Sequence, residues 1–185
     1  MPSYCEYCLN HPEDILNRGY HDSQYGFPIS DDNGLFERLI LEINQAGLSW
    51  ITILKKADHF HRAYDGFDIQ TVAGYGEAET ARLLADAGII RNRLKVNAAI
   101  HNAKIIETLQ AEFGSFKNWL DANAHLDHAG WTKLFKKTFV FTGGEIVNEF
   151  LMSTGYLPGA HDQDCPVFLE VEKQQPAWMS KGKQR

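Results

Sequence analysis

The sequence lacks any uninterrupted run of eighteen apolar residues, and this absence argues against a membrane-spanning helix. Its first residues lack a basic segment followed by an apolar one, so we expect no signal peptide and a cytoplasmic location. Only three cysteines occur among 185 residues. In a chain without a signal peptide, so few cysteines do not indicate a disulfide framework. Eight histidines, by contrast, make metal binding worth testing.

An excess of positive charge is also missing. The 24 acidic residues outnumber the 18 basic ones, and the net charge is −6. Proteins that coat nucleic acid owe much of their affinity to phosphate neutralisation, so this balance argues against such a role. It still permits a local basic patch on an acidic body. Repeats and low-complexity stretches are absent, and the length suits a single domain over residues 1–185.

Helical spacing of apolar residues dominates the chain. Over residues 33–46 it predicts one helix, with Gly47 placed to end it and Ser49 placed to cap the next. Only the run at 138–142 has a strand pattern, and it is too short and isolated to build a sheet. The sequence therefore predicts an all-α fold with a polar, basic tail at about 174–185 that frays.

Two helices joined by a tight apolar turn are predicted at about 77–111. The turn begins at Gly88, contains two isoleucines, and is followed by Arg91, Arg93 and Lys95. Backbone N–H groups at the start of the second helix, flanked by these basic side chains, would suit a DNA phosphate. A helical hairpin with a solvated basic end explains the same pattern, and the sequence alone leaves both interpretations open.

Cysteine and histidine residues gather in two parts of the chain that are far apart in sequence. They are Cys5, Cys8, His11 and His21 in the N-terminal part, and His161 and Cys165 in “HDQDC”. Two cysteines and two histidines would form a closed, tetrahedral zinc site of the structural kind. The alternative is a set of unrelated residues on loops and in small apolar gaps, which the spacing alone slightly favours.

Four stretches occur in order across most of the chain: “YHDSQYGFP” (20–28), “LFERLILEINQAGLSWITILKK” (35–56), “DAGIIRNRLK” (86–95) and “HDQDC” (161–165). Together they resemble the 3-methyladenine DNA glycosylase I family of bacterial alkylation-repair enzymes. The resemblance implies a helix–hairpin–helix glycosylase fold and a monomer that acts on double-stranded DNA containing alkylated bases. It also implies hydrolysis of the N-glycosidic bond of 3-methyladenine after base flipping.

The resemblance further implies one structural zinc ion that ties the N- and C-terminal segments together. Three family ligands map to His21, His161 and Cys165. The fourth is an N-terminal cysteine, which in the family is followed two residues later by an aromatic residue. Cys5 satisfies that pattern, whereas an ungapped spacing to His21 would favour Cys8. We choose Cys5 and keep Cys8 as its rival.

The family's base pocket consists of aromatic residues and one glutamate, which the resemblance maps to Tyr20, Tyr25, Glu42 and Trp50. Tyr25 departs from the family, which usually has tryptophan at that position. Aromatic faces attract an electron-poor base, and Glu42 would complement its positive charge and is our candidate catalytic residue. There are non-functional alternatives. Glu42 could lie at the border of the apolar stripe and reach solvent, and the aromatic residues could pack in the core.

Two further departures concern the DNA contacts. Leu94 stands where the family often has glycine, and Gly144 and Glu145 replace small hydroxyl residues near the DNA. Two other functions also compete with the enzyme: a DNA-binding paralogue without turnover, and a zinc-containing interaction module. The presence of Tyr20, Glu42 and Trp50 favours the enzyme over the paralogue, and the basic hairpin counts against the module.

Overall fold

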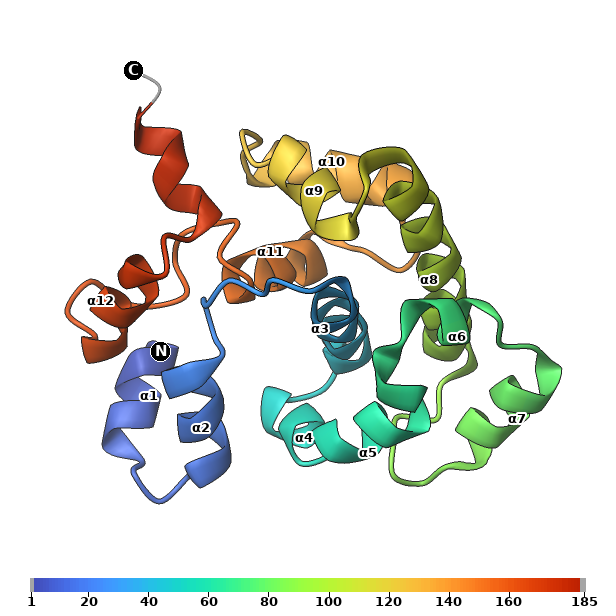
Figure 1. Cartoon of the computed structure of the whole chain (residues 1–185). Coiled ribbons are helices and arrows are strands. Elements are labelled where there is room, and N and C mark those ends of the chain that lie inside the picture. Colours follow the sequence, from blue (N-terminus) through green and yellow to red (C-terminus); the bar gives the residue numbers. More distant parts are fainter. Residues whose placement is uncertain (1, 184–185) are drawn as a thin grey trace.

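A computed structural model describes residues 2–183, and every regular element within them is a helix. The predicted all-α class is therefore confirmed. Figure 1 shows a central helix, α3 (Asp32–Gln45), with the N-terminal helices on one side of it and α8 (Arg93–Phe113) on the other. Within the described residues, no helix is both long and apolar enough to cross a membrane.

The remaining helices are short. On the N-terminal side of α8 they are α1 (Tyr4–Asn10), α2 (Ile15–Ser23), α4 (Trp50–Leu54), α5 (Ala57–Ala63), α6 (Ile69–Ala73) and α7 (Glu77–Ala85), with a 3₁₀ turn at Asp65–Phe67. After it come α9 (Phe116–Ala122), α10 (His128–Thr138), α11 (Gly144–Ser153), α12 (Pro166–Lys173) and a 3₁₀ helix at Ala177–Lys183. The strand-like run at 138–142 forms the turn between α10 and α11.

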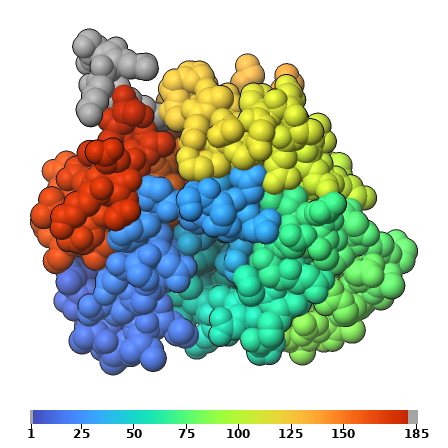
Figure 2. Space-filling model, in the orientation of Figure 1, coloured from blue at the N-terminus to red at the C-terminus, as the bar shows by residue number. Residues whose placement is uncertain are grey.

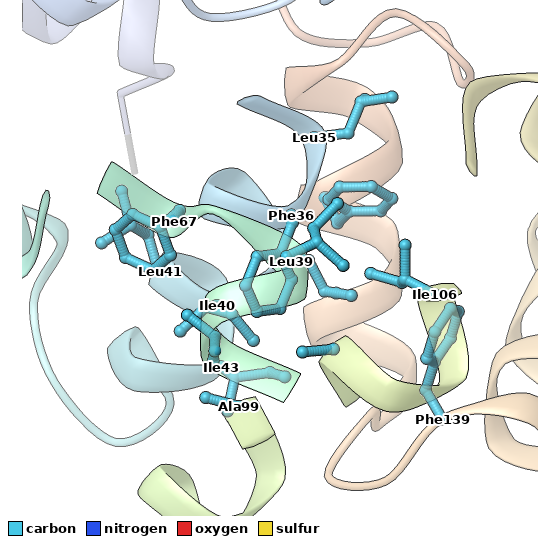
Figure 3. Close-up of a cluster of buried hydrophobic side chains, with 14 of the residues drawn as sticks. Leu35, Phe36, Leu39, Ile40, Leu41, Ile43, Phe67, Ala99, Ile106 and Phe139 are labelled. Atoms are coloured by element: carbon cyan, nitrogen blue, oxygen red, sulfur yellow. The ribbon is translucent and has the colours of Figure 1, made fainter. Parts of the chain in front are cut away.

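The core is built around α3. Asp31 begins this helix by accepting the backbone N–H of Gly34 at 2.7 Å. Five apolar side chains then recur at helical spacing and are fully buried: Leu35, Phe36, Leu39, Ile40 and Ile43. Figure 3 shows how side chains from α8 and the 3₁₀ turn surround them. Burial of each such side chain contributes about 1.5–3 kcal/mol, so α3 is fixed by contacts on several sides.

The carboxyl end of α3 is held by a buried lysine. Gly47 ends the helix with a positive φ of 82°, as the sequence predicted. Lys95, at the start of α8, donates hydrogen bonds to the carbonyl oxygens of Asn44 and Ala46, at 2.7 and 2.8 Å. These bonds satisfy carbonyl groups that the helix leaves unpaired, and they fix the turn that leads to Trp50.

The N-terminal helices pack beside a segment from near the other end of the chain. In Figures 1 and 2 the N-terminal helices lie beside α12 and the segment that precedes it. The sequence predicted a frayed tail from about 174, but residues 177–183 form a 3₁₀ helix. Trp178 explains the difference, because its backbone N–H donates to the carbonyl of Gly155 and its ring contacts Phe168. Residues 184 and 185 lie outside the described part of the chain.

Candidate active site

A cavity of about 260 Å³ lies where α1, α2, α3, α4 and α11 approach one another. Its walls are three tyrosines, a tryptophan, a glutamine and two glutamates: Tyr4, Tyr20, Tyr25, Glu42, Gln45, Trp50 and Glu149. The structure thus brings together the four residues that the sequence analysis assigned to the base pocket. Tyr4, Gln45 and Glu149 were not anticipated.

Aromatic rings form one continuous wall of this cavity. The ring centroids of Tyr20 and Trp50 lie 5.0 Å apart, and those of Tyr20 and Tyr25 lie 5.6 Å apart. Tyr4 meets Tyr25 edge to face at 5.5 Å. The indole N–H of Trp50 is buried and has no hydrogen-bond partner among the described residues. Since a buried donor without a partner is unfavourable, this N–H is available to a ligand.

Glu42 places a carboxylate in the same cavity. Only 3% of the residue is exposed, and no hydrogen bond joins its carboxylate to any described residue. Burial raises its pKa to about 8, Arg38 opposes that shift, and the charge of Glu149 adds to it. The alternative interpretation of Glu42, as a border residue that reaches solvent, is therefore wrong. A desolvated carboxyl group with free oxygens suits a ligand that carries positive charge or N–H donors, because a nearby cation favours its ionised form.

Arg38 is a buried cation that the sequence analysis missed. Its guanidinium lies 4.9 Å from the ring centroid of Tyr20 and donates a 3.0 Å hydrogen bond to that residue's hydroxyl oxygen. A second bond, of 3.3 Å, reaches the carbonyl of Ser153. Arg38 lies one helical turn before Glu42. Because it falls outside the apolar spacing of α3, the sequence pattern indicates an exposed side chain at this position. It links α2, α3 and α11 and fixes the ring of Tyr20.

Glu149 supplies a second carboxylate, from α11. The hydroxyl of Tyr25 donates to its Oε2 atom at 3.2 Å. Burial raises the pKa of Glu149, whereas the hydrogen bond from Tyr25 lowers it. No short-range pattern in the sequence connects residue 149 with residues 20–50, so only the folded chain reveals this carboxylate.

A larger hollow, of about 740 Å³, lies between α2 and the helices α3 to α5, and Figure 2 shows it on the face that carries the N-terminal helices. Tyr20 and Trp50 line this hollow as well as the smaller cavity. Its glutamate, Glu37, is paired with His61 at 3.2 Å. The smaller cavity is the better candidate for a specific ligand, because its carboxylate Glu42 is buried and unpaired.

The cysteine and histidine residues of both chain ends meet in one buried cluster. The ligand atoms of Cys5, His21, His161 and Cys165 all lie within 4.8 Å of one another. The four sulfur–nitrogen distances are 3.3, 3.6, 3.7 and 3.8 Å. Tetrahedral zinc with ordinary bond lengths would place sulfur and nitrogen ligands about 3.6 Å apart, so the arrangement fits such an ion. Cys8 is buried elsewhere and is not part of the cluster.

Hydrogen bonds orient both imidazole rings of the cluster. His21 Nδ1 lies 2.6 Å from a carboxylate oxygen of Asp22, and His161 Nε2 donates to the carbonyl of Tyr25 at 2.7 Å. Each remaining ring nitrogen therefore faces the cysteine sulfurs. Because Tyr20 precedes His21 in the chain and Tyr25 accepts from His161, the cluster also holds two walls of the cavity.

The residues assigned to DNA contacts differ in their exposure to solvent. Arg91 and Arg93 are exposed after the turn between α7 and α8, and Gly88 is half-buried within it. A Cβ atom at Gly88 would lie 2.4 Å from the ring of His59, so the turn can pack this closely against His59 only with glycine at this position. Lys95 does not fit the predicted role. It is 5% exposed, and its ammonium is bonded to the end of α3.

Comparison with known proteins assigns the family. The model of the methyladenine glycosylase family matches residues 10–133. DNA-3-methyladenine glycosylase 1 of Escherichia coli is 47% identical over 92 residues, an alignment that spans 50% of this chain and 49% of that protein. DNA-3-methyladenine glycosylase of Haemophilus influenzae is 31% identical over 166 residues, which are 80% of this chain and 89% of that protein.

A solved structure gives the same assignment. It is that of 3-methyladenine DNA glycosylase I from Staphylococcus aureus, determined for its recognition of 3-methyladenine. It superposes with a TM-score of 0.80 at 29% identity, over 89% of this chain and 97% of that one. Sequence and fold therefore agree that the chain belongs to the methyladenine glycosylase family.

Proposed function

We propose that this chain is a monofunctional DNA glycosylase that hydrolyses the N-glycosidic bond of 3-methyladenine in double-stranded DNA. The observation that carries the proposal is the unpaired carboxylate of Glu42, buried beside the rings of Tyr20 and Trp50. Family membership supports it, because the relatives compared above are 3-methyladenine DNA glycosylases.

The chemistry of the substrate explains why such a pocket suffices. An enzyme that acts on a base within a duplex must first flip it out of the stack. While attached to the sugar, 3-methyladenine carries a delocalised positive charge, so its glycosidic bond is already weak. Aromatic faces and a desolvated carboxylate favour that cation over neutral adenine, which would not offset the buried charge equally well. Selective binding by Tyr20, Trp50 and Glu42 thereby performs much of the discrimination.

Zinc is the ion that the cysteine and histidine cluster suits best. Two thiolates and two imidazoles in a closed, buried arrangement are typical of structural zinc and leave no position open for a reacting water. The ion would join α1, α2 and the 161–165 segment. Burial and the neighbouring Cys165 raise the pKa of Cys5 to about 12, although the backbone N–H of Asp162 opposes the shift, so metal binding would have to release the thiol proton.

The turn between α7 and α8 is our candidate for the helix–hairpin–helix contact with DNA. Arg91 and Arg93 are exposed there, and backbone N–H groups at the start of α8 are available to a phosphate. Lys95 is excluded from this contact by its burial. A local basic turn on a chain of net charge −6 fits an enzyme that engages DNA briefly. We expect a monomer that works in the cytoplasm.

The test is release of free base from methylated duplex DNA. The wild-type chain should release 3-methyladenine, and Glu42→Gln should impair that release because the amide cannot complement the cation. Glu37→Gln is the matched control, since Glu37 lies on the same helix but is paired with His61. Salt-dependent DNA binding without release would indicate a non-catalytic paralogue. Neither binding nor release would indicate an interaction module.

A further inference from the structure

The two carboxylates of the cavity occupy different depths. Glu42 is almost fully buried, whereas Glu149 is half-buried. A second hollow, of about 1010 Å³, lies between the end of α3 and the start of α11 and is here called the outer cleft. Of the residues that line the base cavity, Gln45 and Glu149 also line the outer cleft. Glu149 therefore stands at the mouth of the cavity, and Glu42 stands in its interior.

We take the outer cleft, rather than the larger hollow that Tyr20 and Trp50 line, as the side from which a flipped nucleotide enters the cavity. When its base occupies the cavity, the glycosidic bond and the deoxyribose lie at the boundary between the cavity and the outer cleft. Gln45 is unsuited to charge stabilisation there, because it is neutral and its amide donates to the carbonyl of Leu48 at 2.8 Å. Glu149 is thus the ionisable side chain that both hollows share.

We propose that Glu149 is a catalytic residue that faces the deoxyribose, stabilises the sugar cation and accepts a proton from the attacking water. This inference rests on the proposed glycosylase function. The two carboxylates then have different roles. Glu42 recognises the charged base, and Glu149 stabilises the positive charge after it has moved to the sugar.

The movement of charge during the reaction gives the reason for two groups. The C1′–N9 bond breaks and its electron pair stays with the base, which leaves as neutral 3-methyladenine. The positive charge passes to C1′ and the ring oxygen of the deoxyribose. The water oxygen then bonds to C1′, and its proton passes to the carboxylate of Glu149 and from there to solvent. A carboxylate that touched only the base would stabilise the ground state, whereas one at the sugar stabilises the transition state.

The local structure holds Glu149 in position for this task. The hydroxyl of Tyr25 donates to Oε2 at 3.2 Å, and the side chain of Asn148 also bonds to this carboxylate. Tyr25 in turn is fixed through its carbonyl, which accepts from His161. Tyr25 and Asn148 therefore orient the carboxylate, and its oxygens keep lone pairs for the sugar or the water.

The test compares single-turnover excision of 3-methyladenine from duplex DNA by the wild-type chain, Glu149→Gln and Glu37→Gln. Glu37 lies on α3, is paired with His61, and lines neither the cavity nor the outer cleft. Glu149→Gln should lower the rate constant roughly 100-fold, the low end for one positioned acid–base group. Glu37→Gln should leave it unchanged. Binding of free 3-methyladenine, followed by tryptophan fluorescence, should be the same in all three proteins.

Retained binding with a selectively lowered rate in Glu149→Gln supports the proposal. A rate within about twofold of wild type overturns it. An equal loss in Glu37→Gln, or a loss of free-base binding in Glu149→Gln, also overturns it, because either result indicates a general effect of charge or of folding. Tyr25→Phe provides a second check and should lower the rate to an intermediate value. If the wild-type chain releases no 3-methyladenine, the proposed function fails together with this inference.

Discussion

The substitution Glu42→Gln should change how the stability of the protein depends on pH. Burial raises the pKa of Glu42 from 4.5 to about 8; Arg38 opposes this shift and Glu149 adds to it. A raised carboxyl pKa means that the folded state disfavours the ionised form. The contribution of Glu42 to stability is therefore fully present below pH 4.5 and is lost as the pH rises through about 8.

The size of this effect follows from the two pKa values. One unit corresponds to about 1.4 kcal/mol, so the penalty grows from about 1 kcal/mol near pH 5.5 to about 4–5 kcal/mol near pH 8.5. Glutamine does not ionise, and its unpaired amide carries a penalty of about 1–3 kcal/mol at every pH. The free energy of unfolding of Glu42→Gln, relative to wild type, should therefore rise by about 3 kcal/mol across this range.

Urea unfolding at a series of pH values, with the same zinc concentration for both proteins, measures this difference. Other groups titrate in both proteins, so their contributions cancel when the two free energies are subtracted. A difference that stays flat with pH would refute the claim that Glu42 is desolvated and unpaired. A difference that falls with pH would mean that the wild-type carboxylate has a stabilising partner.

Three further predictions concern other parts of the molecule. Metal analysis should find one zinc ion per wild-type chain and per Cys8→Ser chain, but none in Cys5→Ser; zinc retained by Cys5→Ser would contradict the ligand set. Arg91→Gln should reduce the slope of log affinity for DNA against log salt by about one, and an unchanged slope would remove Arg91 from the DNA face. Gly88→Ala should lower the unfolding free energy in urea by about 1–3 kcal/mol through its clash with His59. Adding His59→Ala should restore most of that loss, and a failure to do so would exclude the clash as its cause.

The central helix could be predicted from sequence because local rules determine it. Its apolar spacing and its end at Gly47 act within a few residues, and the structure has them where the pattern places them. The choice between Cys5 and Cys8 could not be made in this way. Both are buried on α1, one turn apart. Only the packing of the 161–165 segment determines which sulfur meets the histidines.

The errors and omissions share a long-range cause. Lys95 follows two arginines in a basic turn, so its surroundings in sequence indicate a solvated or DNA-facing side chain. The structure buries it because the carbonyls of Asn44 and Ala46, at the end of another helix, offset the desolvation of its ammonium. Glu149 was missed for the same reason, since the tyrosine that orients it is distant in the chain.

The positions of the two buried cations also explain why Glu42 remains available to a ligand. Lys95 donates its hydrogen bonds to backbone carbonyls at the end of α3. Arg38 donates to the hydroxyl of Tyr20 and the carbonyl of Ser153. Arg38 thus lowers the pKa of Glu42 through space without occupying its oxygens. A direct ion pair would stabilise the fold, but a cationic base would then have to displace it. The unpaired Glu42 lowers the stability of the fold, but it also lets the pocket bind a positively charged base. Such a loss of stability is expected where binding depends on a destabilised group.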